Sequence, residues 1–73
     1  MNYTVIELQD GIVGAVYRYT PGEYEDPLAE AEAKFHALLA VAAKSSVPNH
    51  GCILISSIGV VNKKEFYPHG GET

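Results

Sequence analysis

A length of 73 residues suffices for one small globular domain, and a hydrophobic content of 47% excludes a disordered chain. A net charge of −4 without a basic stripe excludes a binder of duplex nucleic acid, because lysine and arginine contacts to phosphate supply most of that affinity. The single cysteine, Cys52, excludes an intrachain disulfide, and the longest apolar run, residues 37–43, is far too short to span a bilayer. We therefore expect one cytoplasmic domain over residues 1–73 that does not enter a membrane.

The first predicted element is a β-hairpin. Its strands, Tyr3–Leu8 and Ile12–Thr20, are joined at Asp10 and Gly11, a residue pair typical of two-residue turns. Such a turn predicts these pairs: Leu8 with Val13, Ile6 with Ala15 and Thr4 with Tyr17 on one face, and Val5 with Val16 and Tyr3 with Arg18 on the other. Both faces hold apolar residues, so we expect both to need cover.

A helix is predicted from about Pro27 to about Ser45. Asp26 suits its N-cap, and proline suits the first helical position. Apolar residues at helical spacing form a first stripe, made of Leu28, Ala31, Phe35, Leu38, Leu39 and Ala42. A second face widens this stripe and consists of Ala33, Ala37, Ala40, Val41 and Ala43. Either this second face lets another helix approach closely, or its alanines are present as the best helix formers.

Pro48 biases the chain away from helix, and a second hairpin follows it. Its strands are predicted over His50–Ser57 and Val60–Tyr67 with a turn at Gly59, and residues 70–73 are expected to form a flexible tail. The fold class is therefore α+β: an antiparallel four-stranded sheet in the order β-β-α-β-β with one long Ala-rich helix. Because one helix covers one sheet face, we expect a homodimer or higher oligomer to cover the other.

Metal and catalytic chemistry have little basis in the sequence. His36, His50, His69 and Cys52 match no usual zinc spacing. The simpler interpretation is that the histidines donate hydrogen bonds to the backbone or surround a polar pocket. The sequence holds no Gly-x-Ser-x-Gly elbow and no glycine-rich phosphate loop. We expect no metal, no cofactor and no catalysis; a His-assisted hydrolysis of a phosphate ester is the third alternative.

Binding of a small anion has a broader basis. The five tyrosines present flat rings with polar tips, which suit stacking on a base. Four basic side chains can pair with an anionic group: Arg18, Lys63, Lys64 and His69. Alternatively, tyrosine and lysine are ordinary cross-strand and edge residues of an antiparallel sheet.

Residues 30–69 resemble a group of small proteins encoded by phages and prophages of Firmicutes. The shared pattern is an acidic-alanine helix entry, an aromatic-His pair, an Ala-Ala-x-Ser step, a following histidine and a late aromatic-x-His. In this chain the pattern corresponds to residues 30–33, Phe35 with His36, residues 42–45, His50, and Tyr67 with His69. The resemblance covers more than half of the chain and implies a phage origin and the cytoplasm of a bacterial host.

Small phage proteins of this build resemble anti-defence sponges, which are symmetric oligomers that enclose nucleotide-derived immune signals, such as cyclic dinucleotides or cyclic ADP-ribose derivatives, without degrading them. A subunit too small for a deep pocket can build one at a symmetric interface. We therefore expect a homo-oligomer that sequesters a small anionic, nucleotide-like signal through these residues: Arg18, His36, Ser45, His50, Lys63, Tyr67 and His69. The alternative is a protein–protein interaction module, such as an inhibitor of a host defence protein or a phage accessory factor, whose acidic run Glu23–Asp26 meets a basic partner.

Overall fold

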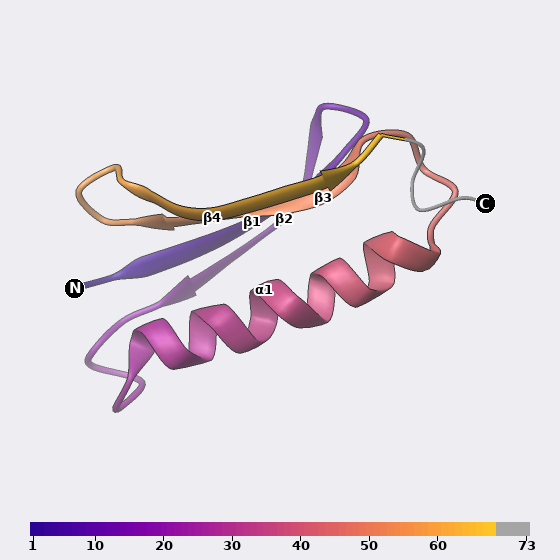
Figure 1. The fold of residues 1–73 in the computed structure, drawn as a ribbon. Helices are drawn as coiled ribbons and strands as arrows, with labels where there is room; N and C mark the ends of the chain where they lie inside the picture. Colours follow the sequence, from indigo (N-terminus) through magenta and orange to yellow (C-terminus); the bar gives the residue numbers. More distant parts are fainter. Residues whose placement is uncertain (69–73) are drawn as a thin grey trace.

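The computed structural model describes residues 1–68, in which four strands and one helix follow the predicted order β-β-α-β-β (Figure 1). The elements are β1 (Tyr3–Gln9), β2 (Ile12–Tyr19), α1 (Pro27–Lys44), β3 (His50–Ser56) and β4 (Val61–Tyr67). The strands form one antiparallel sheet, so the predicted α+β fold class is confirmed. His69 and the tail predicted at residues 70–73 lie outside the described residues.

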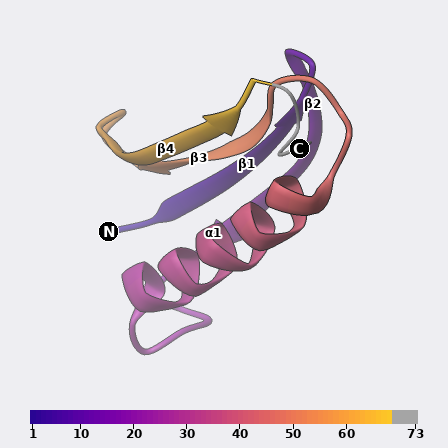
Figure 2. The ribbon, with the colours of Figure 1, turned by 45° about the vertical axis from the view of Figure 1, so that its right-hand side comes forward.

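The sheet has a covered and an uncovered side. Its strand order is β2-β1-β3-β4, so β1 and β3 are central and β2 and β4 form the edges. α1 lies across one side, and within residues 1–68 no element lies across the other (Figures 1 and 2). The near-continuous apolar character of β3 accords with its central position, where both strand faces carry apolar side chains.

The first hairpin turns at Asp10 and Gly11 as predicted. Their φ angles of 55° and 79° fit a two-residue turn that requires positive φ at both positions. Leu8 then pairs with Val13, also as predicted. Beyond Gly14 the predicted register is wrong, because a β-bulge adds one unpaired residue to β2 at this point. The observed pairs are Glu7 with Ala15, Ile6 with Val16, Val5 with Tyr17, Thr4 with Arg18, and Tyr3 with Tyr19.

This one-residue shift changes which side chains of β2 lie beneath the helix. Tyr17 and Tyr19 share the side of Val5 and pack against the buried core, while Val16 and Arg18 lie on the uncovered side. Because side chains alternate between the two sides of a strand, a shift of one residue moves every later side chain of β2 to the opposite side of the sheet. The bulge therefore decides the composition of both faces.

The helix begins where the capping signal predicted. The Ala29 backbone N–H donates a hydrogen bond to the Asp26 carboxylate over 3.2 Å, and Pro27 occupies the first helical position. At the other end Ser45 is the C-cap residue, and its N–H donates to the carbonyl of Ala42 over 3.1 Å. Local sequence thus fixes both ends of α1 to within one residue of the prediction.

Replacing Asp26 with alanine should lower the free energy of unfolding by about 1 kcal/mol, because the first turn of α1 loses a capping acceptor. Urea denaturation followed by circular dichroism measures the change. Glu25→Ala is the matched control, since Glu25 is exposed and lies just outside the helix. An equal loss of stability in both variants would contradict a capping role.

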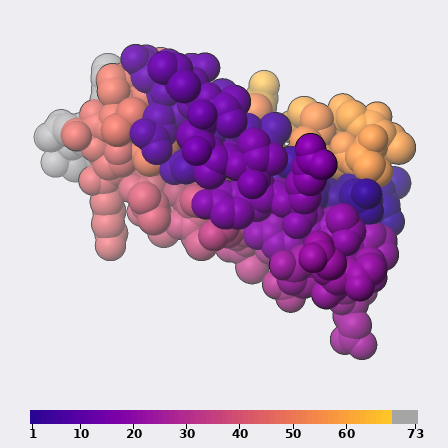
Figure 3. All heavy atoms as spheres, turned by 180° about the vertical axis from the view of Figure 1, so that it is seen from behind, coloured from indigo at the N-terminus to yellow at the C-terminus, as the bar shows by residue number. Residues whose placement is uncertain are grey.

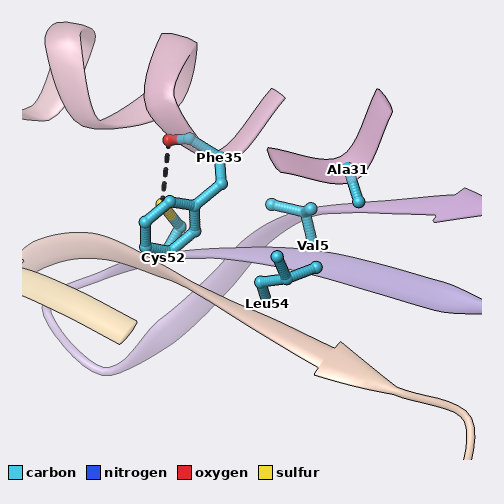
Figure 4. Close-up of a cluster of buried hydrophobic side chains, with 5 residues drawn as sticks. All are labelled: Val5, Ala31, Phe35, Cys52 and Leu54. Carbon is cyan, nitrogen blue, oxygen red and sulfur yellow. Dashed lines mark hydrogen bonds between the residues drawn. The ribbon is translucent and has the colours of Figure 1, made fainter. Parts of the chain in front are cut away.

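The buried core lies between α1 and the central strands (Figure 4). Val5 and Leu54 from the sheet meet Ala31 and Phe35 from the helix, and Cys52 completes the cluster. These side chains are few and mostly small, which matches a domain in the size range where a lone core is marginal. The second helix face contributes little to this core, since Val41 is 57% exposed and Ala33, Ala37 and Ala40 are exposed as well.

Candidate binding surface

The sheet side away from α1 is largely apolar, and we call it the open face. Its members follow from the cross-strand pairs, which place these side chains together: Thr4, Ile6, Leu8, Val13, Val16, Arg18, Ile53, Ile55, Val61, Lys64 and Phe66. Val16 is 51% exposed and Val61 is 48% exposed, although both are aliphatic. Figure 3 shows the N-terminal hairpin, in indigo and purple, uncovered along one flank of the molecule. A contiguous apolar surface of this kind marks an interaction site more often than a solvated one.

A glycine in β3 leaves room for an aromatic ring of β4 on the open face. Gly51 pairs with Phe66, and a Cβ built at Gly51 would lie only 2.6 Å from Cδ1 of Phe66 and 2.1 Å from the carbonyl oxygen of Glu65. A side chain at this position would therefore displace both the ring and the backbone of β4. The Phe66 ring fills the space and makes the surface over β3 and β4 continuous.

The charges of the open face are all positive among the described residues. Arg18 lies on β2 opposite Thr4, and Lys64 lies on β4 opposite Ile53. The neighbouring Lys63 points to the helix side, where its Nζ is 3.9 Å from a carboxylate oxygen of Glu32. In a chain with a net charge of −4, one sheet face thus carries two cations and no acid.

The helix side of the sheet holds a buried, hydrogen-bonded pair of side chains. Nε2 of His50 lies 2.8 Å from Oε2 of Glu7, and the two side chains are only 4% and 13% exposed. Nδ1 of His50 has no hydrogen-bond partner among the described residues. Because His50 is almost wholly enclosed, its ring is an internal partner of Glu7 rather than a surface group that a ligand can reach.

Cys52 lies beside this pair, and its thiol is unreactive. Burial, followed by the nearby carboxylates of Glu7 and Glu65, raises the pKa of the Cys52 thiol to about 11. The thiol donates a hydrogen bond of 3.5 Å to the carbonyl of Phe35, seen as the dashed line in Figure 4. A thiol that stays protonated and buried is a poor nucleophile.

The seven residues predicted to bind a ligand do not gather at one place. His50 and Tyr67 are cross-strand partners on the helix side, and Lys63 is on the same side with Glu32. Ser45 uses its Oγ to accept the Val47 N–H over 3.0 Å at the end of the helix.

The remaining predicted residues lie elsewhere. His36 is exposed on α1, where its ring meets the edge of Phe35 at 5.6 Å between centroids. Arg18 is on the open face, and His69 lies outside the described residues. The sequence-based set omitted Lys64, whose face depends on the register of β4.

The tyrosines take part in packing within the subunit. Tyr3, Tyr17 and Tyr19 lie against the core, and the Lys34 ammonium sits 4.2 Å from the centroid of the Tyr17 ring. Tyr19 also contacts Tyr24 at 5.2 Å between ring centroids. Burial, then the neighbouring Tyr24, raises the pKa of Tyr19. These contacts favour the simpler interpretation, in which the rings are ordinary cross-strand residues.

The comparisons with known proteins give no relative. No protein-family model matches the chain, and neither a curated protein nor a solved structure matches it. The likeness to phage proteins therefore stays an expectation from the sequence. In residues 1–68, no helix combines the length and apolar character needed to cross a bilayer. The same residues contain no enclosed pocket and no group of three or more His, Cys, Asp or Glu side chains arranged for a metal ion.

Proposed function

We propose that this protein is a non-enzymatic binding protein that works as an assembly of copies and holds a small anionic, nucleotide-like ligand between them. The observation that carries the proposal is the pair Arg18 and Lys64, which gives the open face a purely positive charge in an acidic chain. In its cellular role, proposed from the resemblance to phage proteins, the protein sequesters a nucleotide-derived immune signal of the bacterial host.

The charge pattern supports an anionic ligand. The described acids lie in turns and loops, along α1 or on the helix side of the sheet, so none opposes a phosphate that approaches the open face. Arginine and lysine bind phosphate oxygens through charge-assisted hydrogen bonds. The apolar side chains next to each cation on the edge strands, Val16 beside Arg18 and Phe66 beside Lys64, suit the flat face of a base.

The spacing of the cations supports a site shared between copies. Arg18 and Lys64 lie on strands separated by two others, which is about 14 Å across the sheet, and the two-residue offset along the strands brings the separation to about 16 Å. Because side chains stand roughly perpendicular to a sheet, the two charges of one subunit are placed to bind separate phosphate groups. In an assembly, one cation from each of two copies can meet the same ligand.

The absence of catalysis is supported by the location of the reactive side chains. His50 and Cys52 are enclosed beneath α1, where His50 contacts Glu7 and the thiol contacts a backbone carbonyl. The described side chains of the open face include no histidine, cysteine or carboxylate, and its two cations, Arg18 and Lys64, bind negative charge. The exposed His36 lies on α1, away from this face.

A capture assay tests the proposal. Purified protein is incubated with cyclic dinucleotides and cyclic ADP-ribose derivatives, unbound compound is removed, and the protein is heat-denatured to release what it held. Recovery of the intact compound supports sequestration, whereas its conversion to a product would show catalysis. A compound left wholly in the unbound fraction would contradict both functions.

Lys64→Ala should weaken capture by about ten-fold to a hundred-fold, which corresponds to the loss of about 1.5–3 kcal/mol for a hydrogen bond to a charged group. Lys63→Ala is the matched control and should leave capture unchanged, because Lys63 is the next residue but points to the helix side. Isothermal titration with the captured compound measures both affinities. The reverse result, with Lys63 essential and Lys64 dispensable, would overturn the assignment of the open face.

One observation favours the second candidate function, a protein–protein interaction module. Glu23, Glu25 and Asp26 are all exposed in the loop before α1 and form a compact acidic segment. Such a segment steers association with a basic partner. A protein that captures no nucleotide, but whose pull-down of a host protein is lost when Glu23 and Glu25 are both replaced with glutamine, would favour this function.

A further inference from the structure

The open face has the layout of a protein–protein interface. Its centre, formed by β1 and β3, carries no charged side chain: Thr4, Ile6 and Leu8 come from β1, and Gly51, Ile53 and Ile55 come from β3. The two cations, Arg18 and Lys64, are confined to the edge strands. An apolar centre with charge restricted to the rim is the arrangement found in stable interfaces, since rim charges stay hydrated after association.

We infer that a second copy of this chain packs its open face onto this one, sheet against sheet, with the central strands of both copies in the middle. The inference deepens the proposed function, because it names the surface between the copies. A twofold arrangement uses the same patch on both subunits and closes after two. The product is a β-sandwich core about 10 Å thick with one helix on each outer side.

The size of the surface is consistent with such a dimer. Four strands about 4.8 Å apart and seven residues long at about 3.3 Å per residue give a face of about 19 by 23 Å, or about 440 Å² in plan on each copy. The accessible area buried is larger, because side chains stand out from this plane. Since a standard interface buries about 800 Å² per partner, a face of this plan area corresponds to a small interface with weak association.

The occupant is a second copy for two reasons. The open face is a gently twisted sheet surface without a groove, so another sheet of the same twist fits it better than a single helix or strand. A subunit with such a small core also gains the most from a shared one.

Sedimentation equilibrium tests the inference. At about 100 µM, well above the micromolar dissociation constants usual for small interfaces, the unmodified protein should be dimeric. The double variant Val16→Lys with Val61→Lys should be monomeric, because it raises the open face of each copy from two positive charges to four, and the like charges of two facing copies then repel; both sites are already about half exposed. Val41→Lys is the matched control and should remain dimeric, since Val41 is similarly exposed but lies on α1.

Three outcomes would overturn the inference: a monomer for the unmodified protein, a dimer that persists in the double variant, or a dimer that Val41→Lys dissociates, which would assign the interface to the alanine face of α1.

A second measurement needs no substitution. On dilution of the unmodified protein, the methyl resonances of Ile6, Ile53 and Ile55 should shift, while those of Val41 should not. Shifts at Val41 instead of these isoleucines would contradict the inference if the double variant fails to fold.

These results are separable from the proposed function. A dimer that captures no nucleotide would refute the ligand and keep the interface, whereas a monomer that captures one would do the reverse. The variants Arg18→Ala and Lys64→Ala should dimerise as well as or better than the unmodified protein, because they remove like charges from the rim. Added ligand should strengthen the dimer of the unmodified protein, since a ligand held between copies binds the dimer preferentially.

Discussion

Replacing Phe35 with alanine should lower the free energy of unfolding by about 3–5 kcal/mol, the largest loss that we expect from any single core truncation in this chain. Phe35 is only 3% exposed and fills the space between α1 and the central strands (Figure 4). Its neighbours Ala31 and Cys52 are small and cannot expand into the cavity. The loss includes both the transfer of the ring to water and the unfilled volume.

Urea denaturation measures this loss, and the midpoint should move far to lower denaturant. Phe66→Ala is an informative control, because it removes the same ring from the open face, where Phe66 is half-buried. We expect a clearly smaller effect for the monomer, since part of that ring already contacts water. Similar losses for Phe35 and Phe66 in a monomeric sample would contradict the assignment of the core to the helix side. Because the marginal stability of small domains is about 5–15 kcal/mol, the Phe35 variant is best studied at low temperature.

The second large effect concerns the buried pair of Glu7 and His50. Glu7→Ala should lower the free energy of unfolding by about 2–4 kcal/mol, because it removes the one hydrogen-bond partner that the enclosed imidazole has within residues 1–68. The reverse truncation, His50→Ala, should cost a similar amount by stranding the carboxylate. In contrast, the double variant Glu7→Leu with His50→Leu should be much less destabilised than the sum of the single changes, since no buried polar group then remains unpaired.

A double-mutant cycle measured by urea denaturation gives the coupling energy directly. Glu65→Ala serves as the control for the loss of a carboxylate on the same sheet side, because Glu65 is exposed and lies on an edge strand. Strict additivity of the changes at Glu7 and His50 would show that the 2.8 Å contact contributes nothing to the fold.

The sequence predicted the elements well because the signals for them are local. The Asp10-Gly11 turn and the Asp26-Pro27 helix start depend on backbone preferences within a few residues, and both appear where expected. The register of the first hairpin was harder to predict from the sequence. A glycine within a strand is compatible with either a regular ladder or a bulge, and nothing near Gly14 in the sequence separates the two.

The candidate site was predicted less well because it depends on register. Lys63 and Lys64 are adjacent and must face opposite sides, so the choice between them requires the pairing of β4 with β3 and of β2 with β1. Both ladders contain an irregularity, one between Glu7 and Leu8 and one between Leu54 and Ile55. If the two irregularities are ignored, the regular pairing selects Lys63 as the ligand-binding lysine, although Lys63 contacts Glu32 in the structure.

The burial of His50 had a signal that could have been used. Glu7 alternates with Tyr3 and Val5, so an acid falls on the same strand face as the most buried valine. A carboxylate at such a position requires a partner. That partner is 43 residues away in the sequence, and only the antiparallel pairing of β1 with β3 brings it close.

The bulge at Gly14 shows that side-chain orientation in β2 depends on the number of residues in the strand rather than on their identity. Conservative substitutions at the exposed positions of β2 leave the same side chains on the same sides. Deletion of Gly14 would remove the bulge and keep the pairs on both sides of it. An insertion of one residue after Ala15 would instead exchange the sides from that point onward, turning Val16 and Arg18 toward the helix and Tyr17 toward solvent. Insertions in β2 beyond the bulge should therefore be rarer than substitutions among functional variants, even though β2 is an edge strand.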